Sequence, residues 1–586
     1  MHDGTGLTDR PWGGKTADEV VVEGLMSEGM RGVGGQEAVL LAQRGVRDAA
    51  SARRFYDCPL STIGSPRGLK GIERAAEEIR RAAASGWSVG VMGDYDVDGV
   101  MSAAILGRVC TAAGCRKVDV FLPDRRKDGY GLNDKTLVSL AERWASSGVP
   151  DLFVVADSGT SSRRQVDDLR SHGVRSVVVI DHHIPSSHDE IPSADVLVNW
   201  RLSGYDQMCA AGECYLLAME VMGGFAESCL CYAAIATVAD MVPVEGVNRP
   251  IVKHGLGKVF ESNSYGLQNL FMRVCKGSMS QSDVAFKVAP RINSVGRMAH
   301  ADEALALLVA SDNRSVADLL SRMEDLNRRR KAVQADMESQ AVAAAEASGL
   351  SNGLLLVDGR WDASVCGVAC NELVEMYAVP CIMLSSAGGR VKGSGRSPAG
   401  VSVKAIMDRC AHIFSRYGGH DAACGAELKP EFVKDAPRVF DDACAVHYLQ
   451  FGRPDRTIWF DAVVESASDL TVENAAYLHR TFHPYSEHNP EPKFLVPLAT
   501  VSGKEVSEGE TYMRTSFDAT TPDGCTCRVS TFSERLPAFK DGDDVRMLVR
   551  YPQTDGDGDG ECGEWTRASS RGFSMDLSEL RRLGSV

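Results

Sequence analysis

The 586-residue sequence lacks the patterns of a membrane-spanning or exported protein. No run of apolar residues is long enough to span a bilayer, and the first residues, MHDGTGLTDRPWGGKT, show no basic-then-apolar signal pattern. The 17 cysteines include no C-x-x-C pair, the spacing that zinc sites commonly use. A disulfide framework is not expected at this length either. We therefore expect reduced, mostly buried thiols in a cytoplasmic protein.

An excess of positive charge is also missing. The formal net charge of −15 argues against a protein that coats nucleic acid by bulk attraction. A local basic groove stays compatible with this charge, because the local field decides what binds there. With 44% hydrophobic and 24% charged residues the composition is typical of globular domains, and the chain is too long for one hydrophobic core.

What is present is an alternation of helical and strand-like patterns. The segment GIERAAEEIRRAAAS (71–85) has helical spacing, WSVGVM (87–92) is typical of a short buried strand, and GVMSAAILGRVCTAAG (99–114) is again helical. The alternation continues with strand patterns at 117–123, 150–157 and 174–181, and helical patterns at 133–148 and 161–173. It predicts an α/β fold with a parallel sheet covered on both faces.

Later changes of pattern predict the domain organisation. A long helical stretch without Gly or Pro is typical of a connector, a second α/β pattern begins at GLLLVDG, and short strands with turns follow Thr457. The last pattern suggests a small β-barrel of the OB type. We expect an N-terminal region (1–50), a parallel-sheet domain (51–300), a connecting helix (301–349), a second α/β domain (350–450) and the OB-like domain (451–586).

Polar side chains follow three of the predicted strands: Asp96 and Asp98 in GDYDVDG, Asp157, and the group Asp181, His182 and His183. The carboxyl ends of parallel strands meet at one edge of a sheet, where ligands bind. Alone, DYDVDG also fits an Asx-capped turn, and the two histidines also fit a capped turn or buried, hydrogen-bonded imidazoles. The combination at three strand ends favours one shared site.

Clustered carboxylates repel one another unless a cation lies between them. Mixed aspartate and imidazole ligands suit Mn²⁺, and carboxylate oxygens also suit Mg²⁺. Two such ions about 3.5–4 Å apart would make a phosphodiester hydrolase. Asp94 shares the parity of Asp96 and Asp98 but lies nearer the strand, so we expect it to support the ligands rather than bind metal.

Four motifs, DYDVDG, ADSG, DHH and ATVADMVPV, resemble in that order the motifs of the DHH phosphoesterases. KGSGRS (392–397) and RYGGHDAACG (416–425) resemble the associated DHHA1 module. FLPDRRKDGYGLN (121–133) and APRINSVGRM (289–298) resemble RecJ-type exonuclease motifs, and residues 459–494 resemble the OB-fold domain of the same proteins. The sequence is thus similar to RecJ-like exonucleases over most of its length.

The resemblance implies a DHH domain, a long connecting helix, a DHHA1 α/β domain and a C-terminal OB-like β-barrel. It also implies a single-stranded-DNA-specific 5′→3′ exonuclease that hydrolyses phosphodiester bonds by a two-metal mechanism, in DNA repair and recombination. The implied cofactors are two divalent ions, Mn²⁺ or Mg²⁺. The implied partners are single-stranded DNA, a single-strand DNA-binding protein and a helicase, with no membrane, and the chain is expected to be a monomer.

The resemblance also implies roles for particular residues. The metal ligands would be Asp96, Asp98, Asp157, His182 and Asp240, with Asp157 as the bridge. His183 would complete the catalytic group, and Asp94 and Asp181 would orient the ligands. A water shared by the ions would be the nucleophile. The residues that hold DNA phosphates would be Arg125, Arg297, Ser394, Arg396 and His420.

Several features depart from the family pattern or stay open. Met92 stands where some relatives have a histidine, Asp362 and Ser364 change a WHxGVxG pattern, and SEHN (486–489) lacks the glycines of a GEGN turn. The run LNRRRK (326–331) fits a solvated helix face or a line of phosphate contacts equally well. Of the aromatics Trp459, Phe460 and Tyr485 we expect most in a core, although an OB-like groove could use them for a strand.

Two other functions compete with the exonuclease. One is a DHH phosphodiesterase acting on short RNA or cyclic dinucleotides, or a pyrophosphatase. Small enzymes of that kind typically lack the connecting helix and the OB domain that this sequence predicts. The other is a non-catalytic nucleic-acid-binding protein, which would have lost its acidic ligands. Here the motif aspartates and the histidine pair are all present.

Overall fold

The computed structural model describes residues 12–30, 36–185, 187–275, 279–486, 488–508, 513–533, 539–550, 573–575 and 580–582. Residues 1–11, which carry most of the segment tested for a signal pattern, and Cys562 lie outside these ranges. Every other cysteine is a free thiol, and all but Cys115 and Cys525 are buried. The chain divides into two compact units, one with residues up to Phe121, Arg143–Ala289 and those from Thr457, the other with Leu122–Glu142 and Pro290–Arg456.

The predicted parallel sheet is present in the first unit, with its strands in the order β3-β2-β4-β5-β6. The strands are β2 (Ser88–Met92), β3 (Lys117–Phe121), β4 (Leu152–Ala156), β5 (Ser176–Ile180) and β6 (Val196–Val198). The chain runs from β2 to β3 on one side and then crosses to β4 on the other. The carboxyl ends of β2 and β4 therefore form the switch point at which open α/β sheets bind ligands.

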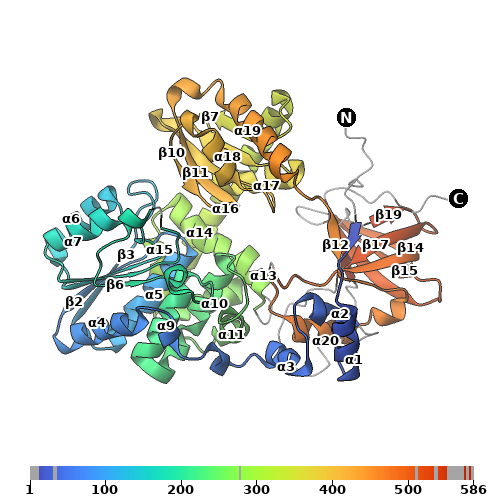
Figure 1. Cartoon of the computed structure of the whole chain (residues 1–586), viewed down its shortest axis with the longest axis horizontal. Helices are drawn as coiled ribbons and strands as arrows, with labels where there is room; N and C mark the ends of the chain where they lie inside the picture. Colours follow the sequence, from blue (N-terminus) through green and yellow to red (C-terminus); the bar gives the residue numbers. More distant parts are fainter. Residues whose placement is uncertain are drawn as a thin grey trace. The chain divides into compact units, whose positions relative to one another are not determined.

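Helices cover this sheet because β4 is apolar along its whole length, β5 is apolar after Ser176, and both strands are fully buried. Three helices pack on one another and on the sheet, as Figure 1 shows in blue and green: α4 (Ile72–Ala84), α5 (Val97–Ala112) and α9 (Ala210–Met222). Other elements of this unit are α7 (Arg163–Ser171), α8 (Trp200–Ser203), α10 (Leu230–Ala239), α11 (Asn248–Gly255), α12 (Tyr265–Val274) and α13 (Gln281–Asp283). Helix α6 (Asp134–Ser147) places Trp144 edge-on to Phe153 of β4, with ring centroids 5.5 Å apart.

Residues Ala210–Ala239 are apolar enough, at a mean hydropathy of 1.5, to resemble a membrane span by length and composition. The stretch is α9 and α10 joined by a short 3-10 segment, and Gly223 at φ +57° ends α9. Helix α9 packs on the sheet and α10 packs on α5, α9 and α11, and 56% of the most apolar window is buried in the protein. Its apolar character is thus accounted for by core packing.

The second unit has a mixed five-stranded sheet in the order β10-β11-β9-β8-β7. Its strands are β7 (Leu354–Asp358), β8 (Cys381–Ser385), β9 (Val391–Arg396), β10 (Phe414–Gly419) and β11 (Ala423–Leu428). Apolar clusters fill both faces, under α17 (Cys366–Tyr377) on one and α18 (Val403–Arg409) and α19 (Ala436–Phe451) on the other. The helix expected over 301–349 is two helices, α15 (Asp302–Val309) and α16 (Asn313–Ser348), because Asp312 caps a new helix by accepting from Ser315 N.

The C-terminal part is strand-rich, as predicted, with β13 to β19 in one seven-stranded sheet. The bounds are β13 (Ala462–Val463), β14 (Phe494–Glu508), β15 (Met513–Thr520), β16 (Thr526–Ser533), β17 (Asp544–Val549), β18 (Phe573–Met575) and β19 (Leu580–Arg582), preceded by β12 (Ile458–Phe460) and α20 (Val472–Phe482).

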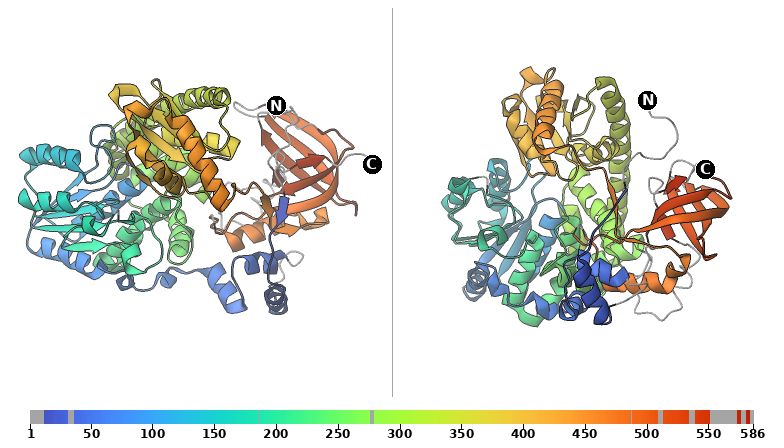
Figure 2. Two further views of the ribbon diagram at one scale, coloured as in Figure 1. Left: turned by 45° about the horizontal axis from the view of Figure 1, so that its top comes forward. Right: turned by 45° about the vertical axis from the view of Figure 1, so that its right-hand side comes forward.

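The N-terminal region packs into this C-terminal part. Strand β1 (Trp12–Gly14) pairs with β12, and residues of α1 (Glu19–Ser27), α2 (Gln36–Gln43) and α3 (Ala49–Asp57) share one apolar core with the C-terminal strands. Lys15 forms an ion pair with Asp461 at 2.8 Å. Figures 1 and 2 both show the blue N-terminal segment beside the orange and red C-terminal elements.

A buried arginine joins the parallel-sheet domain to this core. Arg249 of α11 donates to the carbonyls of Phe55, His483 and Pro484 at 3.2 Å and of Phe482 at 3.4 Å. Its guanidinium lies 3.9 Å from the centroid of the Phe55 ring. Burial lowers the pKa of Arg249 to about 10, so the side chain stays charged at neutral pH.

Replacing Arg249 by methionine should destabilise the protein by about 1–3 kcal/mol, because buried carbonyls lose their donors. The measurement is the urea midpoint of the first unfolding transition. The control is Arg175→Met, whose side chain is 63% exposed and whose loss should matter little. Equal midpoints for the two variants would contradict this role of Arg249.

Candidate metal centre

The acidic turn after β2 is shaped by two glycines. A Cβ on Gly93 would lie 2.2 Å from the Gly99 carbonyl oxygen, and a Cβ on Gly99 would lie 2.2 Å from Asp94 N. Only glycine allows the strand end and the first turn of α5 to approach this closely. Asp96 is the N-cap of α5 and accepts a hydrogen bond from Gly99 N at 3.2 Å. The D-x-D motif is thus both a helix cap and a set of carboxylates at the switch point.

Asp98 is fixed by the N-terminus of α9. Its carboxylate accepts hydrogen bonds from the backbone N–H groups of Ala210 and Ala211, each at 2.8 Å. The backbone N–H groups in the first turn of a helix have no partner within the helix, and they and the helix dipole favour a negative charge there. Asp98 is only 2% exposed, and burial disfavours its negative charge. The two amide hydrogen bonds offset part of this cost and fix the position of the carboxylate.

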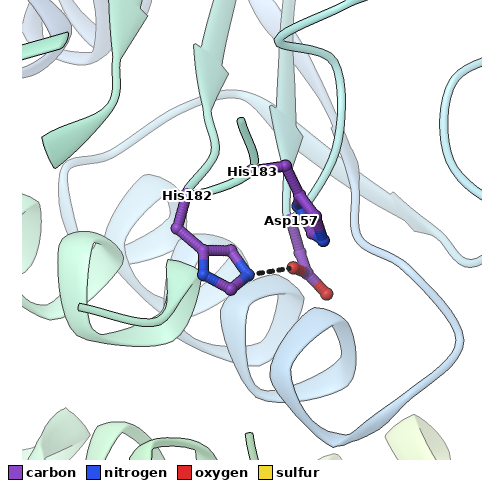
Figure 3. A group of neighbouring side chains, drawn as sticks. All are labelled: Asp157, His182 and His183. Atoms are coloured by element: carbon purple, nitrogen blue, oxygen red, sulfur yellow. Dashed lines mark ion pairs between the residues drawn. The ribbon is translucent and has the colours of Figure 1, made fainter. Parts of the chain in front are cut away.

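Asp157 and His182 meet at the ends of β4 and β5. His182 Nε2 lies 3.3 Å from Asp157 Oδ1 and 3.7 Å from Asp98 Oδ2. Figure 3 shows the His182 ring aimed at the Asp157 carboxylate, with His183 beside it. Asp157 has φ +59°, a left-handed conformation that is uncommon for a non-glycine residue and is found at functional turns.

Asp240 reaches the same place from the end of α10. It is the C-cap of that helix, and its Oδ2 lies 3.8 Å from His182 Nδ1. Met241, the next residue, has φ +56° and is 80% exposed. The turn at the end of α10 directs the Asp240 side chain to the site. From the sequence alone, Asp240 could not be distinguished from an ordinary residue at a helix end.

Three overlapping groups of donors can each hold a metal ion: Asp157, His182 and His183; Asp98, His182 and Asp240; and Asp94, Asp96 and Asp157. All predicted ligands are therefore brought together, and Asp157 belongs to two of the groups. Asp94, expected to support the ligands, lies at ligand distance itself. Met92 is fully buried in β2 and offers no donor of the kind that a histidine would supply.

Asp181 and His183 form a buried pair next to these donors. Asp181 Oδ1 lies 2.7 Å from His183 Nδ1, and Asp181 Oδ2 accepts from Thr160 N at 2.9 Å. Burial lowers the pKa of His183, but the charge and hydrogen bond of Asp181 outweigh it and raise the pKa to about 9. The same partnership holds the pKa of Asp181 well below its ordinary value despite burial. Asp181 thus holds the ring of His183; its role toward the metal ligands stays a prediction.

The negative charges of the clustered carboxylates are unfavourable unless a cation lies between them. Burial raises the pKa of Asp98 to about 6, and burial and the charges of Asp98 and Asp96 raise the pKa values of Asp157 and Asp240 well above the ordinary range. A divalent ion removes this repulsion and favours the charged forms. Buried carboxylates with an imidazole are a donor set that fits Mn²⁺ or Mg²⁺.

The predicted phosphate-binding residues lie in the second unit around the start of α17. Arg297, in α14 (Ala289–Met298), donates to the Ser364 carbonyl at 2.6 Å. A Cβ on Gly367, in the first turn of α17, would lie 3.1 Å from Arg396 Nη2 and 3.2 Å from Ser394 Cβ. Arg297, Ser394 and Arg396 therefore surround one helix N-terminus, a setting that favours anions.

Arg125 and His420, the other two residues predicted to bind phosphate, belong to the same unit. Arg126, the neighbour of Arg125, donates to the Arg297 carbonyl at 2.9 Å and pairs with Asp362 at 3.6 Å. His420 is exposed in the turn between β10 and β11, and its backbone N–H donates to the Ala423 carbonyl at 2.8 Å. Asp362, one of the departures from the family pattern, thus lies just before α17 and is the partner of an arginine.

The structure describes both segments whose roles were left open, and phosphate contacts by LNRRRK stay a prediction. In LNRRRK, Arg330 is buried and donates to Asn327 and Gln334, whereas Arg328 is 77% exposed and pairs with Asp325. Arg328, Arg329 and Lys331 are exposed, so Arg330 is the one cation of the run that is buried. Phe460 and Tyr485 pack on apolar clusters, and Trp459 is 46% exposed.

Sequence reasoning misses Asn199, Arg201 and Thr160, which bind the histidine segment. Asn199 directly follows the apolar strand VLV, so this is a fourth strand end with a polar residue at the same sheet edge. The strand-end argument, applied to every strand, would find it. Thr160 and Arg201 have no such signal, because their positions depend on how two loops fold.

Comparison with known proteins agrees with this geometry. Residues 88–239 match the DHH family, N-terminal domain, and residues 347–445 match the DHHA1 domain. The fold and the site therefore define a DHH-family protein with an attached DHHA1 domain.

The match extends over most of the chain. The single-stranded-DNA-specific exonuclease RecJ of Dickeya dadantii is 30% identical over 487 residues, which are 78% of this chain and 82% of that protein. The chain belongs to the RecJ family. RecJ of Bacillus subtilis is 30% identical over 489 residues, and the chain spans 60% of its length. The structure of RecJ in complex with Mn²⁺ from Thermus thermophilus has a TM-score of 0.78 at 23% identity, covering 99% of this chain and 81% of that one. The predicted family and fold class are confirmed.

Metal binding should release protons from the ligands, and the number of protons released should be larger at low pH. In the metal-free protein the raised pKa of Asp98 contributes stability below its ordinary value near 3.8, and that contribution is lost as pH rises through about 6. A ligand must be deprotonated, so Mn²⁺ affinity should fall about tenfold per pH unit below 6 for each proton displaced. Calorimetry at pH 5.5 and 7.5, in buffers of different ionisation enthalpy, measures both quantities. Affinity and proton release that do not change with pH would contradict this account.

Proposed function

We propose that the protein is a single-stranded-DNA-specific 5′→3′ exonuclease that depends on two divalent ions, Mn²⁺ or Mg²⁺. The observation that carries this proposal is the convergence of Asp94, Asp96, Asp98, Asp157, His182 and Asp240 at one sheet edge, in a chain of the RecJ family. The relatives, which are named for single-stranded DNA, supply the substrate class. Roles in DNA repair and recombination, a cytoplasmic location and a monomeric state belong to the same proposal, as do a single-strand DNA-binding protein and a helicase as partners.

The residues of the chain supply position and charge rather than a nucleophile. Asp157 and His182 each belong to two donor groups, and of these Asp157 would hold both ions through its carboxylate; Asp98 is fixed by the N-terminus of α9. Divalent ions bound here would activate water and stabilise the charge that develops on the phosphate. The carboxylates at this edge are pre-placed by strands, helix ends and backbone amides, so little reorganisation is needed when substrate arrives.

A second set of groups supports recognition of the DNA backbone. Arg297, Ser394 and Arg396 surround the N-terminus of α17, where backbone N–H groups and the helix dipole add to the arginine charges. Such contacts bind phosphate without reading base sequence. This fits an enzyme that removes nucleotides regardless of sequence.

The substrate test compares four labelled substrates in Mn²⁺: 5′-labelled single-stranded DNA, duplex DNA, short RNA and cyclic dinucleotides. Stepwise loss from the 5′ end of the single strand is expected. Asp157→Ala should lower the rate at least about a thousandfold, whereas Asp167→Ala, an exposed aspartate on α7, should leave it unchanged. Activity confined to short RNA or cyclic dinucleotides would replace the exonuclease with the competing phosphodiesterase. No hydrolysis with retained DNA binding would favour a binding protein.

The phosphate contacts predict a second variant. Arg396→Gln should lower kcat/KM on single-stranded DNA about 10- to 100-fold, mainly through KM, because it removes charged hydrogen bonds to phosphate. Arg390→Gln is the matched control, since Arg390 precedes the same strand and its side chain is 67% exposed. Equal KM values for the two variants would remove Arg396 from the DNA-binding residues.

A further inference from the structure

A closed ring of hydrogen bonds joins three neighbouring strand ends beside the metal centre. Asn199 Nδ2 donates to Thr160 Oγ1 at 3.1 Å and to the His183 carbonyl at 3.0 Å. Thr160 N donates to Asp181 Oδ2 at 2.9 Å, and Asp181 Oδ1 lies 2.7 Å from His183 Nδ1. The ring therefore connects the loop after β4, the end of β5 and the end of β6, which lie side by side in the sheet.

The chemistry of this ring requires an amide at residue 199. Asn199 is 1% exposed, and both of its N–H donors are used within the ring. Its Oδ1 accepts from Arg201 N at 2.9 Å and so caps helix α8. An aspartate has the same shape but no donor, and would place a charged oxygen 3.0 Å from the His183 carbonyl.

The same turn also fixes the other histidine. Arg201 Nε donates to the His182 carbonyl at 2.8 Å, and its guanidinium lies 4.2 Å from the centroid of the Trp200 ring. Trp200 N donates to the buried carboxyl of Glu213 at 2.8 Å. Glu213 belongs to α9, the helix whose N-terminus holds Asp98. The backbone of His182 and His183 is thus connected through α8 to α9, the helix whose N-terminus positions Asp98.

We propose that Asn199 is a positioning residue of the metal centre, which fixes the backbone of His183 and the loop that carries Asp157 through Thr160. Thr160 lies three residues after Asp157, whose left-handed backbone conformation needs support from its surroundings. Partners that orient metal ligands in this way commonly change metal affinity or activity about 10- to 100-fold. This inference rests on the metal assignment in the proposed function.

The test measures Mn²⁺ binding directly, by calorimetry and by the loss of the free Mn²⁺ electron paramagnetic resonance signal, together with kcat and KM on single-stranded DNA. Asn199→Asp should weaken Mn²⁺ binding and lower kcat about 10- to 100-fold, with KM changed less than about threefold. Thr160→Val, which removes the acceptor of Asn199, should act in the same direction. Thr160→Ser keeps the hydroxyl and should restore wild-type Mn²⁺ binding.

Asn489→Asp is the matched control. Asn489 is also a buried asparagine whose Nδ2 donates to two carbonyls, of Phe482 at 2.7 Å and Pro484 at 2.9 Å, but it lies in the N- and C-terminal core. Its substitution should lower the melting temperature and leave Mn²⁺ binding unchanged. Comparing Asn199→Asp with Asn489→Asp separates the general effect of replacing a buried asparagine from a specific effect on the metal centre.

The outcomes distinguish the inference from the function on which it rests. Wild-type Mn²⁺ binding in Asn199→Asp and Thr160→Val, with only a lower melting temperature as in Asn489→Asp, would overturn the role of Asn199. If Asn199→Asp does not fold, the Thr160 pair decides the matter alone. If Asp157→Ala binds Mn²⁺ as well as the wild type, the metal assignment itself fails.

Discussion

The mutual repulsion of buried carboxylates is the constraint on which this structure depends. Asp157, Asp98 and Asp240 come from three different elements and meet where the fold buries them, so burial and the charges of neighbouring aspartates raise the pKa of each. Such an arrangement persists only because the surrounding fold dictates it: two glycines let the first turn close, a helix N-terminus fixes Asp98, and a left-handed residue ends β4. A divalent cation bound at this edge would offset the repulsion between these carboxylates.

Much of the fold can be predicted from the sequence, because its strands are short apolar runs between Gly-rich turns. Strand ends and family resemblance predict the motif ligands, and the structure brings them together. Asp94 lies closer to the metal centre than predicted, since spacing in the sequence does not show how sharply a glycine turn bends the chain. Asn199 escapes prediction because the strand before it, Val196–Val198, is too short to be recognised in the sequence. The burial of Arg330, which donates to Asn327 and Gln334 of its own helix, escapes prediction because it depends on how that helix packs in the folded protein.

Charge is used differently in the two compact units. In the first, acids and histidines gather at a sheet edge and are compensated by local pairs such as Asp181 with His183. In the second, arginines gather at a helix N-terminus, with Asp362 as a partner for one of them. A chain with a net charge of −15 can therefore carry a local positive surface, because charges of one sign are gathered in one place.

The packing of the first helices against the last strands has a consequence for synthesis. Lys15 and Asp461 pair across 446 positions, and β14 to β17 complete a core that α1 and α2 begin. During translation the residues of α1 and α2 leave the ribosome first. The strands that cover their apolar faces are synthesised several hundred residues later. At about 5–20 residues per second the delay lasts tens of seconds, during which those faces are available to chaperones or to other nascent chains.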